Sequence, residues 1–419
     1  MSMRALPSLA VATFALGCGG KATTYDPGPG ADASIADSPT ADTPLPEAAP
    51  DVAHDVAKTG CSFAVVASGS ILDPGDSVGG IHGLDVFASP SGFVVSFRED
   101  GHEHGRFTHA WVGDDGEQGP NTSTPIDTLC VLQPARIGSA WSETAGLGLV
   151  AAACGEQQVL TTVDALGVPL EQVVMSMGGT FSMAPADGLA SGDTQDLFYL
   201  AGVGQGQGML RTTFGTMLTA GITPIPGGEG ATSAHVAASP GVTAVLANAD
   251  GGERPYSLSY GDIQLPKYTT VELAEGSAGA LEVWDDRVAA AVARAPGVAW
   301  WEVRVDSGLV QRGEVAMPEP DGLELLRLGD RLFVVGAEDG AVTVAALEEQ
   351  ESGRVEGARI TLDHEDDLPH IALSAGTLLA AAVARDTLMI AWGGTTTVLD
   401  TDIVEGRVGY ALLRCLPAR

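Results

Sequence analysis

Aromatic and basic residues are scarce in this sequence. Only 5% of its 419 residues are aromatic, although 45% are apolar and 55 are glycine. Such a composition favours many short strands joined by turns over long helices. Lysine and arginine together number 21 against 54 acidic residues, so the formal net charge is −33. A field of this sign repels phosphate backbones and anionic lipid head groups, which excludes a nucleic acid as a partner.

Hydrophobic runs of membrane-spanning length are also missing. Residues 5–16 form an apolar run of about a dozen residues, whereas a spanning helix needs about 20. One positive charge, Arg4, precedes the run. A short apolar segment behind a positive charge is typical of a secretory signal peptide, so we expect the chain to be exported.

The end of this segment carries a resemblance. The stretch FALGC, residues 14–18, resembles the lipobox of bacterial lipoproteins, in which the cysteine is diacylated and becomes the mature N-terminus. The resemblance covers only these residues, and Ala15 stands where the family usually has leucine. It implies that residues 1–18 are a lipoprotein signal peptide and that Cys18 carries the lipid. The alternative is an ordinary cleaved signal peptide with an incidental cysteine.

The residues after Cys18 indicate a destination and a linker. Gly19 and Gly20 stand where the family's inner-membrane proteins often have Asp. The resemblance therefore implies a lipid-anchored protein of the outer membrane. Residues 19–60 interleave acidic residues with Pro, Ala, Ser and Thr. Such a segment has few side chains that can build a core, so we expect a disordered acidic linker.

A repeated unit indicates the fold of residues 61–419. A turn followed by an apolar run occurs seven times, with centres about 43 to 56 residues apart. Examples of the run are FVVSF at 93–97, RVAAAVAR at 287–294 and TLLAAAVAR at 377–385. We expect each run to be a second strand, preceded by a half-polar first strand such as LEVW at 281–284 and followed by two more strands.

This period predicts an all-β fold, a single β-propeller of about seven four-stranded blades. Both faces of a blade are buried against its neighbours, which explains runs that are apolar throughout. The alternatives are a long sandwich or two separate β-domains. Trp141 and Trp284 fall near first strands, closest to the axis, and we expect them to pack between blades.

The cysteines other than Cys18 are even in number. In an exported protein Cys61, Cys130, Cys154 and Cys415 indicate a disulfide framework, for which the sequence permits three connectivities. Because a ring brings its ends together, we predict a Cys61–Cys415 bridge that closes it. The remaining pair would form a second bridge, Cys130–Cys154, between adjacent blades.

No catalytic motif is present. The sequence has no Gly-x-Ser-x-Gly elbow and no His-Glu-x-x-His, so we assign no catalytic residue and expect no cofactor. The stretch REDGHEHGRFTH, residues 98–109, holds three of the eight histidines. In an extended hairpin His102 and His104 would project together and could bind zinc. A solvated polar hairpin is the alternative.

The sequence therefore predicts a non-enzymatic binding or scaffolding module of the cell envelope. We expect a monomer that contacts the membrane through its lipid, with an envelope protein or a glycan as partner. A rival hypothesis is an extracellular glycan hydrolase or lyase, which requires carboxylates that converge on the propeller axis. A third is an assembly factor for outer-membrane proteins, which requires an exposed apolar groove or sheet edge.

Overall fold

The computed structural model describes residues 61–417 with internal gaps. The gaps are residues 73–79, 101–104, 126–136, 155–156, 177–178, 186–189, 192–193, 205–206, 215–216, 230, 250–254, 262–267, 306–307, 318–319, 321, 339–340, 351–352, 364–377 and 398–403. Every regular element in the described ranges is a β-strand. None of the described residues forms a helix with the length and hydrophobicity that a membrane span requires.

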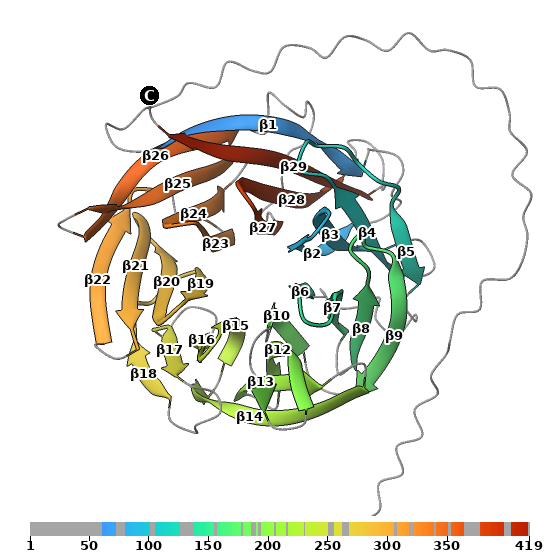
Figure 1. Cartoon of the computed structure of the whole chain (residues 1–419), viewed down its shortest axis with the longest axis horizontal. Coiled ribbons are helices and arrows are strands. Elements are labelled where there is room, and N and C mark those ends of the chain that lie inside the picture. The colour runs from blue at the N-terminus through green and yellow to red at the C-terminus, as the bar shows by residue number, and fades with distance from the viewer. Residues whose placement is uncertain are drawn as a thin grey trace, which may run out of the picture. The chain divides into compact units, whose positions relative to one another are not determined.

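The strands form antiparallel sheets arranged as blades (Figure 1). Five blades follow chain order from the innermost strand outwards. Their strands are β2 (Ile81–Ser89), β3 (Gly92–Asp100), β4 (Gly105–Val112) and β5 (Thr122–Pro125); β6 (Ile137–Ser142), β7 (Leu147–Cys154), β8 (Gln157–Val163) and β9 (Pro169–Ser176); β15 (Ala231–Ser239), β16 (Val242–Ala249), β17 (Ser257–Gly261) and β18 (Thr269–Glu272); β19 (Ala278–Trp284), β20 (Arg287–Arg294), β21 (Gly297–Arg304) and β22 (Gly308–Val315); and β23 (Gly322–Leu328), β24 (Arg331–Glu338), β25 (Ala341–Gln350) and β26 (Gly353–Asp363).

Two further blades depart from this order. One joins the chain ends: it runs from β27 (Leu378–Ala384) through β28 (Thr387–Thr397) and β29 (Val404–Pro417) to β1 (Cys61–Leu72). The other contains β10 (Gly179–Pro185), β12 (Thr194–Gly204), β13 (Gln207–Phe214) and β14 (Met217–Glu229), with β11 (Ala190–Ser191) paired to β12 off the main path.

The innermost strands close a circle. Going round the ring, β2 contacts β6, and the contacts continue through β10, β15, β19, β23 and β27 back to β2. The expected all-β single propeller is therefore confirmed. The expectation of about seven four-stranded blades needs correction: six sheets have four strands, and the sheet with β10 has five. The extra strand arises because the chain between β10 and β12 folds back on β12, pairing Ala190 with Gln195.

Where their burial is described, the second strands are buried on both faces, as their composition predicted. In β20 the six residues from Val288 to Ala293 are all fully buried. Alternate side chains point to opposite faces of a strand. Ala289, Ala291 and Ala293 pack in one cluster with residues of β24, and the alternate residues of β20 pack in another with residues of β16 and β17. The short alanine side chains allow the neighbouring sheets to approach closely.

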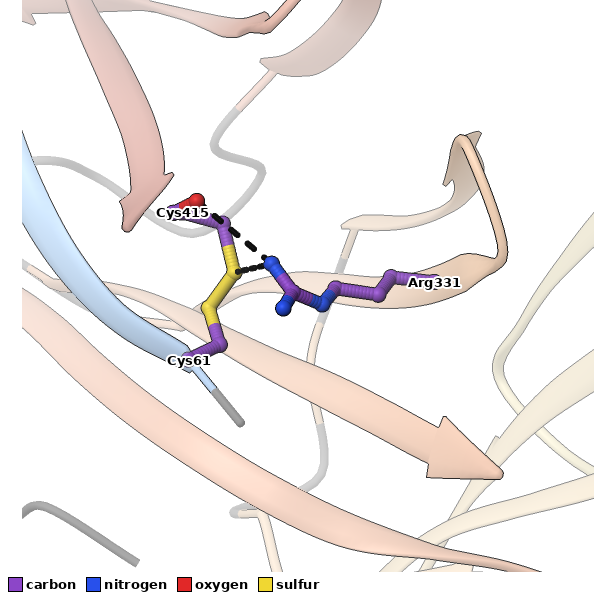
Figure 2. Close-up of a disulfide and its surroundings, with 3 residues drawn as sticks. All are labelled: Cys61, Arg331 and Cys415. Carbon is purple, nitrogen blue, oxygen red and sulfur yellow. Dashed lines mark hydrogen bonds between the residues drawn. A yellow bond between two sulfur atoms is a disulfide. The ribbon is translucent and has the colours of Figure 1, made fainter. Parts of the chain in front are cut away.

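The closing blade joins the two ends of the ring. β1 pairs antiparallel with β29 from Cys61–Pro417 to Leu72–Val408. The predicted Cys61–Cys415 disulfide is present, with a Cα–Cα distance of 5.4 Å across 354 residues of sequence. Figure 2 shows Nη1 of Arg331 donating to the Cys415 carbonyl oxygen at 3.4 Å and approaching its sulfur at 3.1 Å. Cys18, Cys130 and the side chain of Cys154 lie outside the described residues.

The strand assignment of this blade was wrong in one respect. The apolar run that we expected to be a second strand is the innermost strand, β27. Because β1 supplies the outermost strand of this blade, the C-terminal strand β29 becomes its third and every preceding strand shifts inwards by one place. Sequence alone places the repeat but not the strand at which the chain ends meet.

Loss of the disulfide should weaken the closure without abolishing it. Substituting Cys61→Ser and Cys415→Ser together should lower the free energy of unfolding by about 2 to 4 kcal/mol, because the unfolded chain is no longer restricted by so long a loop. Guanidinium denaturation of wild type and variant measures the change. An unchanged midpoint and slope would show that the bridge contributes nothing to ring closure.

Candidate functional site

A cavity of about 670 Å³ lies among the innermost strands. Its lining comes from β2, β6, β15, β19, β23 and β27, so residues far apart in the sequence share one space. We call it the axial cavity. Its size falls within the range of small-molecule sites, about 300 to 1,000 Å³. Four carboxyl groups line it: Asp85, Glu282 and Glu324, which stand on the innermost strands of three different blades, and Glu143, which follows β6.

Asp85, on β2, is held by hydrogen bonds. Its Oδ1 accepts from the Val86 amide at 2.9 Å, and its Oδ2 accepts from the Ser139 hydroxyl at 3.0 Å and from the Ser139 amide. Burial raises the pKa of Asp85 to about 7, and these hydrogen bonds oppose part of that rise. Because Ser139 belongs to β6, the carboxylate also joins two neighbouring blades at the wall of the cavity.

Glu282, on β19, experiences a weak positive field. Burial raises the pKa of this carboxyl to about 8, and the Arg327 guanidinium and the Val283 amide oppose the rise. The Arg327 guanidinium carbon lies 5.4 Å from the ring centroid of Trp284, and its Nη2 lies 3.8 Å from Oδ1 of Asp330. Arg327 therefore interacts with Trp284 and Asp330 as well as with Glu282, and it offsets the negative charge of Glu282 only in part.

Glu324, on β23, lies in an unfavourable electrostatic environment. Burial raises its pKa well above the usual value, and the negative charges of Asp85 and Glu282 raise it further. None of the described lysines or arginines forms an ion pair with any of these three carboxyl groups. Glu324 therefore experiences the negative charges of both other carboxyl groups across the cavity.

An aromatic pair forms part of the same wall. Phe87 of β2 and Trp141 of β6 are stacked, with ring centroids 6.3 Å apart and an interplanar angle of 16°. Phe87 lies two residues after Asp85, and Trp141 lies two residues after Ser139. Because residues two apart share a face of a strand, both rings lie on the same strand faces as the Asp85–Ser139 pair. Both rings line the axial cavity. Nε1 of Trp141 has no hydrogen-bond partner in the described structure, and the residue is 8% exposed.

The metal prediction falls outside the described residues, since His102 and His104 both lie in the gap 101–104. Around the gap, Glu99 accepts from Arg106 Nη2 at 2.7 Å, and His109 Nδ1 lies 3.0 Å from Ser96 Oγ. Burial lowers the pKa of His109 to about 4. Among the described residues no three His, Cys, Asp or Glu side chains are placed to hold a metal ion.

The cavity carboxyl groups were missed from the sequence, although a signal was present. A small residue, Leu, an acidic residue and an aliphatic residue follow one another in GLDV at 83–86, ALEV at 280–283 and GLEL at 322–325. One acidic residue within a short apolar stretch of the first strand recurs in three blades. The expectation that Trp141 and Trp284 lie near the axis is confirmed, since both belong to innermost strands.

Comparison with known proteins gives the fold and nothing finer. No family model matches the chain, and no curated protein matches it. Among solved structures, Kuenenia stuttgartiensis hydrazine synthase is similar with a TM-score of 0.51 and 10% identity, over 75% of this chain and 92% of that one. The Dos1 propeller has a TM-score of 0.46 and 9% identity, over 83% of this chain and 95% of that one. The six-bladed Aleuria aurantia lectin has a TM-score of 0.41 and 13% identity, over 68% of this chain and 96% of that one.

At such identities the likeness concerns the fold alone. The fold is identified by the ring of blades, which is closed by strands from the two ends of the described range. Residues 61–417, as far as they are described, form a single β-propeller with an acidic cavity on its axis.

Proposed function

We propose that this chain is an exported, lipid-anchored protein of the bacterial outer membrane whose propeller binds a small ligand in the axial cavity without transforming it. The lipobox-like sequence and the acidic linker support the location. The cavity carries the binding proposal: it has the volume of a ligand site, and three blades direct carboxyl groups into it. A monomer suffices for this role, because the site is complete within one chain.

The proposed location has its own prediction. Substituting Cys18→Ala should move the protein from the membrane fraction to the soluble envelope fraction, because the lipid would be its anchor. Fractionation of cells expressing wild type and variant, with immunodetection, measures the distribution. Equal membrane retention of both forms would contradict lipid anchoring at Cys18.

Ligand binding is tested with the full-length protein in detergent. Thermal unfolding is followed with a panel of neutral sugars, amino sugars, polyamines and organic acids. A ligand at 100 times its dissociation constant stabilises the folded state by about 2.7 kcal/mol. We expect at least one class to raise the melting temperature of wild type.

A pair of variants locates the binding. Ala237→Phe places a ring at the half-buried cavity wall, and Ala316→Phe adds the same ring at an exposed position that does not line the cavity. The ligand effect should be lost in Ala237→Phe and kept in Ala316→Phe. No stabilisation by any class, or equal stabilisation of both variants, would contradict binding in the axial cavity.

Glycan hydrolysis is a second candidate for the same cavity. A carboxyl group that stays protonated near neutral pH can act as the general acid of glycoside cleavage, with a second carboxylate as base or nucleophile. The raised pKa of Glu282 favours this candidate. Chromatography of polysaccharides incubated with the protein distinguishes the two candidates. Cleavage products that form with wild type but not with Glu282→Gln would support hydrolysis. Polysaccharide that stays intact with wild type would support binding alone.

A further inference from the structure

The charge lining the axial cavity is one-sided. Its titratable groups are His82, Asp85, Glu143, His235, Glu282 and Glu324, and the described lining contains no lysine or arginine. The innermost strands β10 and β27 have no titratable residue in their sequences. Arg327 acts on Glu282 from outside the lining, and it also contacts Trp284 and Asp330. A cationic group in the cavity would lower the pKa of these carboxyl groups and pair with their ionised forms, because an opposite charge nearby favours ionisation.

The aromatic wall adds a second, independent requirement. The Trp141 indole nitrogen is a hydrogen-bond donor that is buried and has no acceptor among the described residues. An unsatisfied buried donor is unfavourable by about 1 to 3 kcal/mol, so a ligand oxygen placed there is favoured. Phe87 and Trp141 are 4% and 8% exposed and line the cavity with that small part of their surface, against which the carbon face of a sugar ring or a cation can pack.

These requirements converge on one class of ligand. Resting on the proposed binding function, we propose that the axial cavity binds an amino sugar, with its ammonium groups at Asp85, Glu282 and Glu324, a ring face on Phe87 and Trp141, and a hydroxyl oxygen at Trp141 Nε1. A simple polyamine lacks the oxygen and the ring face. A neutral sugar lacks the positive charge that the carboxyl groups favour.

The probe is the fully deacetylated trimer of glucosamine, compared with the N-acetylated trimer. The two share rings, linkages and hydroxyl groups, and differ in the acetyl groups that remove the positive charge. Isothermal titration of the full-length protein in detergent at physiological ionic strength suppresses loose binding to the acidic surface. We expect one site per chain, and at least 10-fold weaker binding of the acetylated trimer.

Variants assign the contacts. Glu282→Gln with Glu324→Gln should weaken the deacetylated trimer at least 10-fold. Glu171→Gln with Glu272→Gln removes the same charge from exposed positions outside the cavity and should leave affinity unchanged. Trp141→Phe keeps an aromatic ring but deletes the donor, and should weaken binding about 3- to 10-fold.

The outcomes separate the inference from the proposed function. Equal binding of both trimers in the cavity, insensitive to the Glu282→Gln and Glu324→Gln pair, would overturn the amino-sugar inference and leave ligand binding standing. Equal weakening by the exposed and the cavity pairs would also overturn it, because the effect would then come from net charge. An unchanged affinity in Trp141→Phe would overturn the contact at Nε1. Failure of every class of ligand in the thermal panel would remove both proposals.

Discussion

A chain that begins at residue 73, and therefore lacks β1, should fail to form a stable monomeric propeller. β1 places Phe63, Ile71 and Leu72 in the core, each no more than 6% exposed. Phe63 packs against Phe333 of the neighbouring blade, with ring centroids 5.9 Å apart. Removing one such buried side chain costs about 2 to 5 kcal/mol. The three together approach the whole stability of a typical protein, about 5 to 15 kcal/mol.

The matched control begins at residue 60 and keeps β1. Size-exclusion chromatography and thermal unfolding compare the two truncated chains. We expect a cooperative transition for the longer chain, and aggregation or a non-cooperative transition for the shorter one, because the β29 edge becomes unpaired and prone to association. A cooperative, monomeric transition of the shorter chain at the same temperature would contradict closure of the ring by β1.

The paired substitution Glu282→Gln and Glu324→Gln should stabilise the protein at alkaline pH. Folding raises the pKa of both carboxyl groups, so the folded state favours their protonated forms. Their contribution to stability is fully present below the unfolded pKa, about 4.5, and is lost as pH rises through the folded values. Wild type should therefore lose stability between about pH 5 and pH 9, and the uncharged variant should not.

The expected size of this effect follows from the shifts. One pKa unit corresponds to about 1.4 kcal/mol. The shift of Glu282, discounted because its side chain is only half-buried, gives a gain on the order of 3 kcal/mol for the variant at pH 9 and little difference at pH 5. The raised pKa of Glu324 acts in the same direction. Urea denaturation at the two pH values measures it, with Glu171→Gln and Glu272→Gln as the surface control. A variant that follows the wild-type pH profile would contradict desolvation of these carboxyl groups.

The sequence predicts the ring better than it predicts the details of each blade. Six of the seven apolar runs are second strands, because burial on both faces requires a continuous apolar stretch. The run at 377–385 contains the exception, the innermost strand β27. Its composition matches that of the others, since packing near the axis also favours small residues such as Ala380 to Ala382. Which strand the chain ends share depends on closure, which no local pattern records.

The convergence of the cavity carboxyl groups could not be predicted from local patterns either, although an acidic residue recurs in three first strands. Glu282 lies in LEVW, a stretch recognised as a half-polar first strand, yet one acid in one strand does not indicate a site. Asp85, Glu282 and Glu324 come together only because their strands surround one axis. Cys61 and Cys415 were predictable because ring closure imposes a single constraint on the two ends. To predict that three carboxyl groups on separate blades lie close together, one must know how the blades are ordered and rotated.

The most direct test of the central claim, that three blades bring their carboxyl groups into one desolvated cavity, is an NMR titration of ¹³C-labelled glutamate side chains. We predict that the pKa of Glu282 is about 8, that the pKa of Glu324 lies well above the usual range, and that Glu282→Gln lowers the pKa of Glu324 because one neighbouring negative charge is removed. Titration of both groups near 4.5, with Glu324 unaffected by the substitution, would contradict their convergence in the axial cavity.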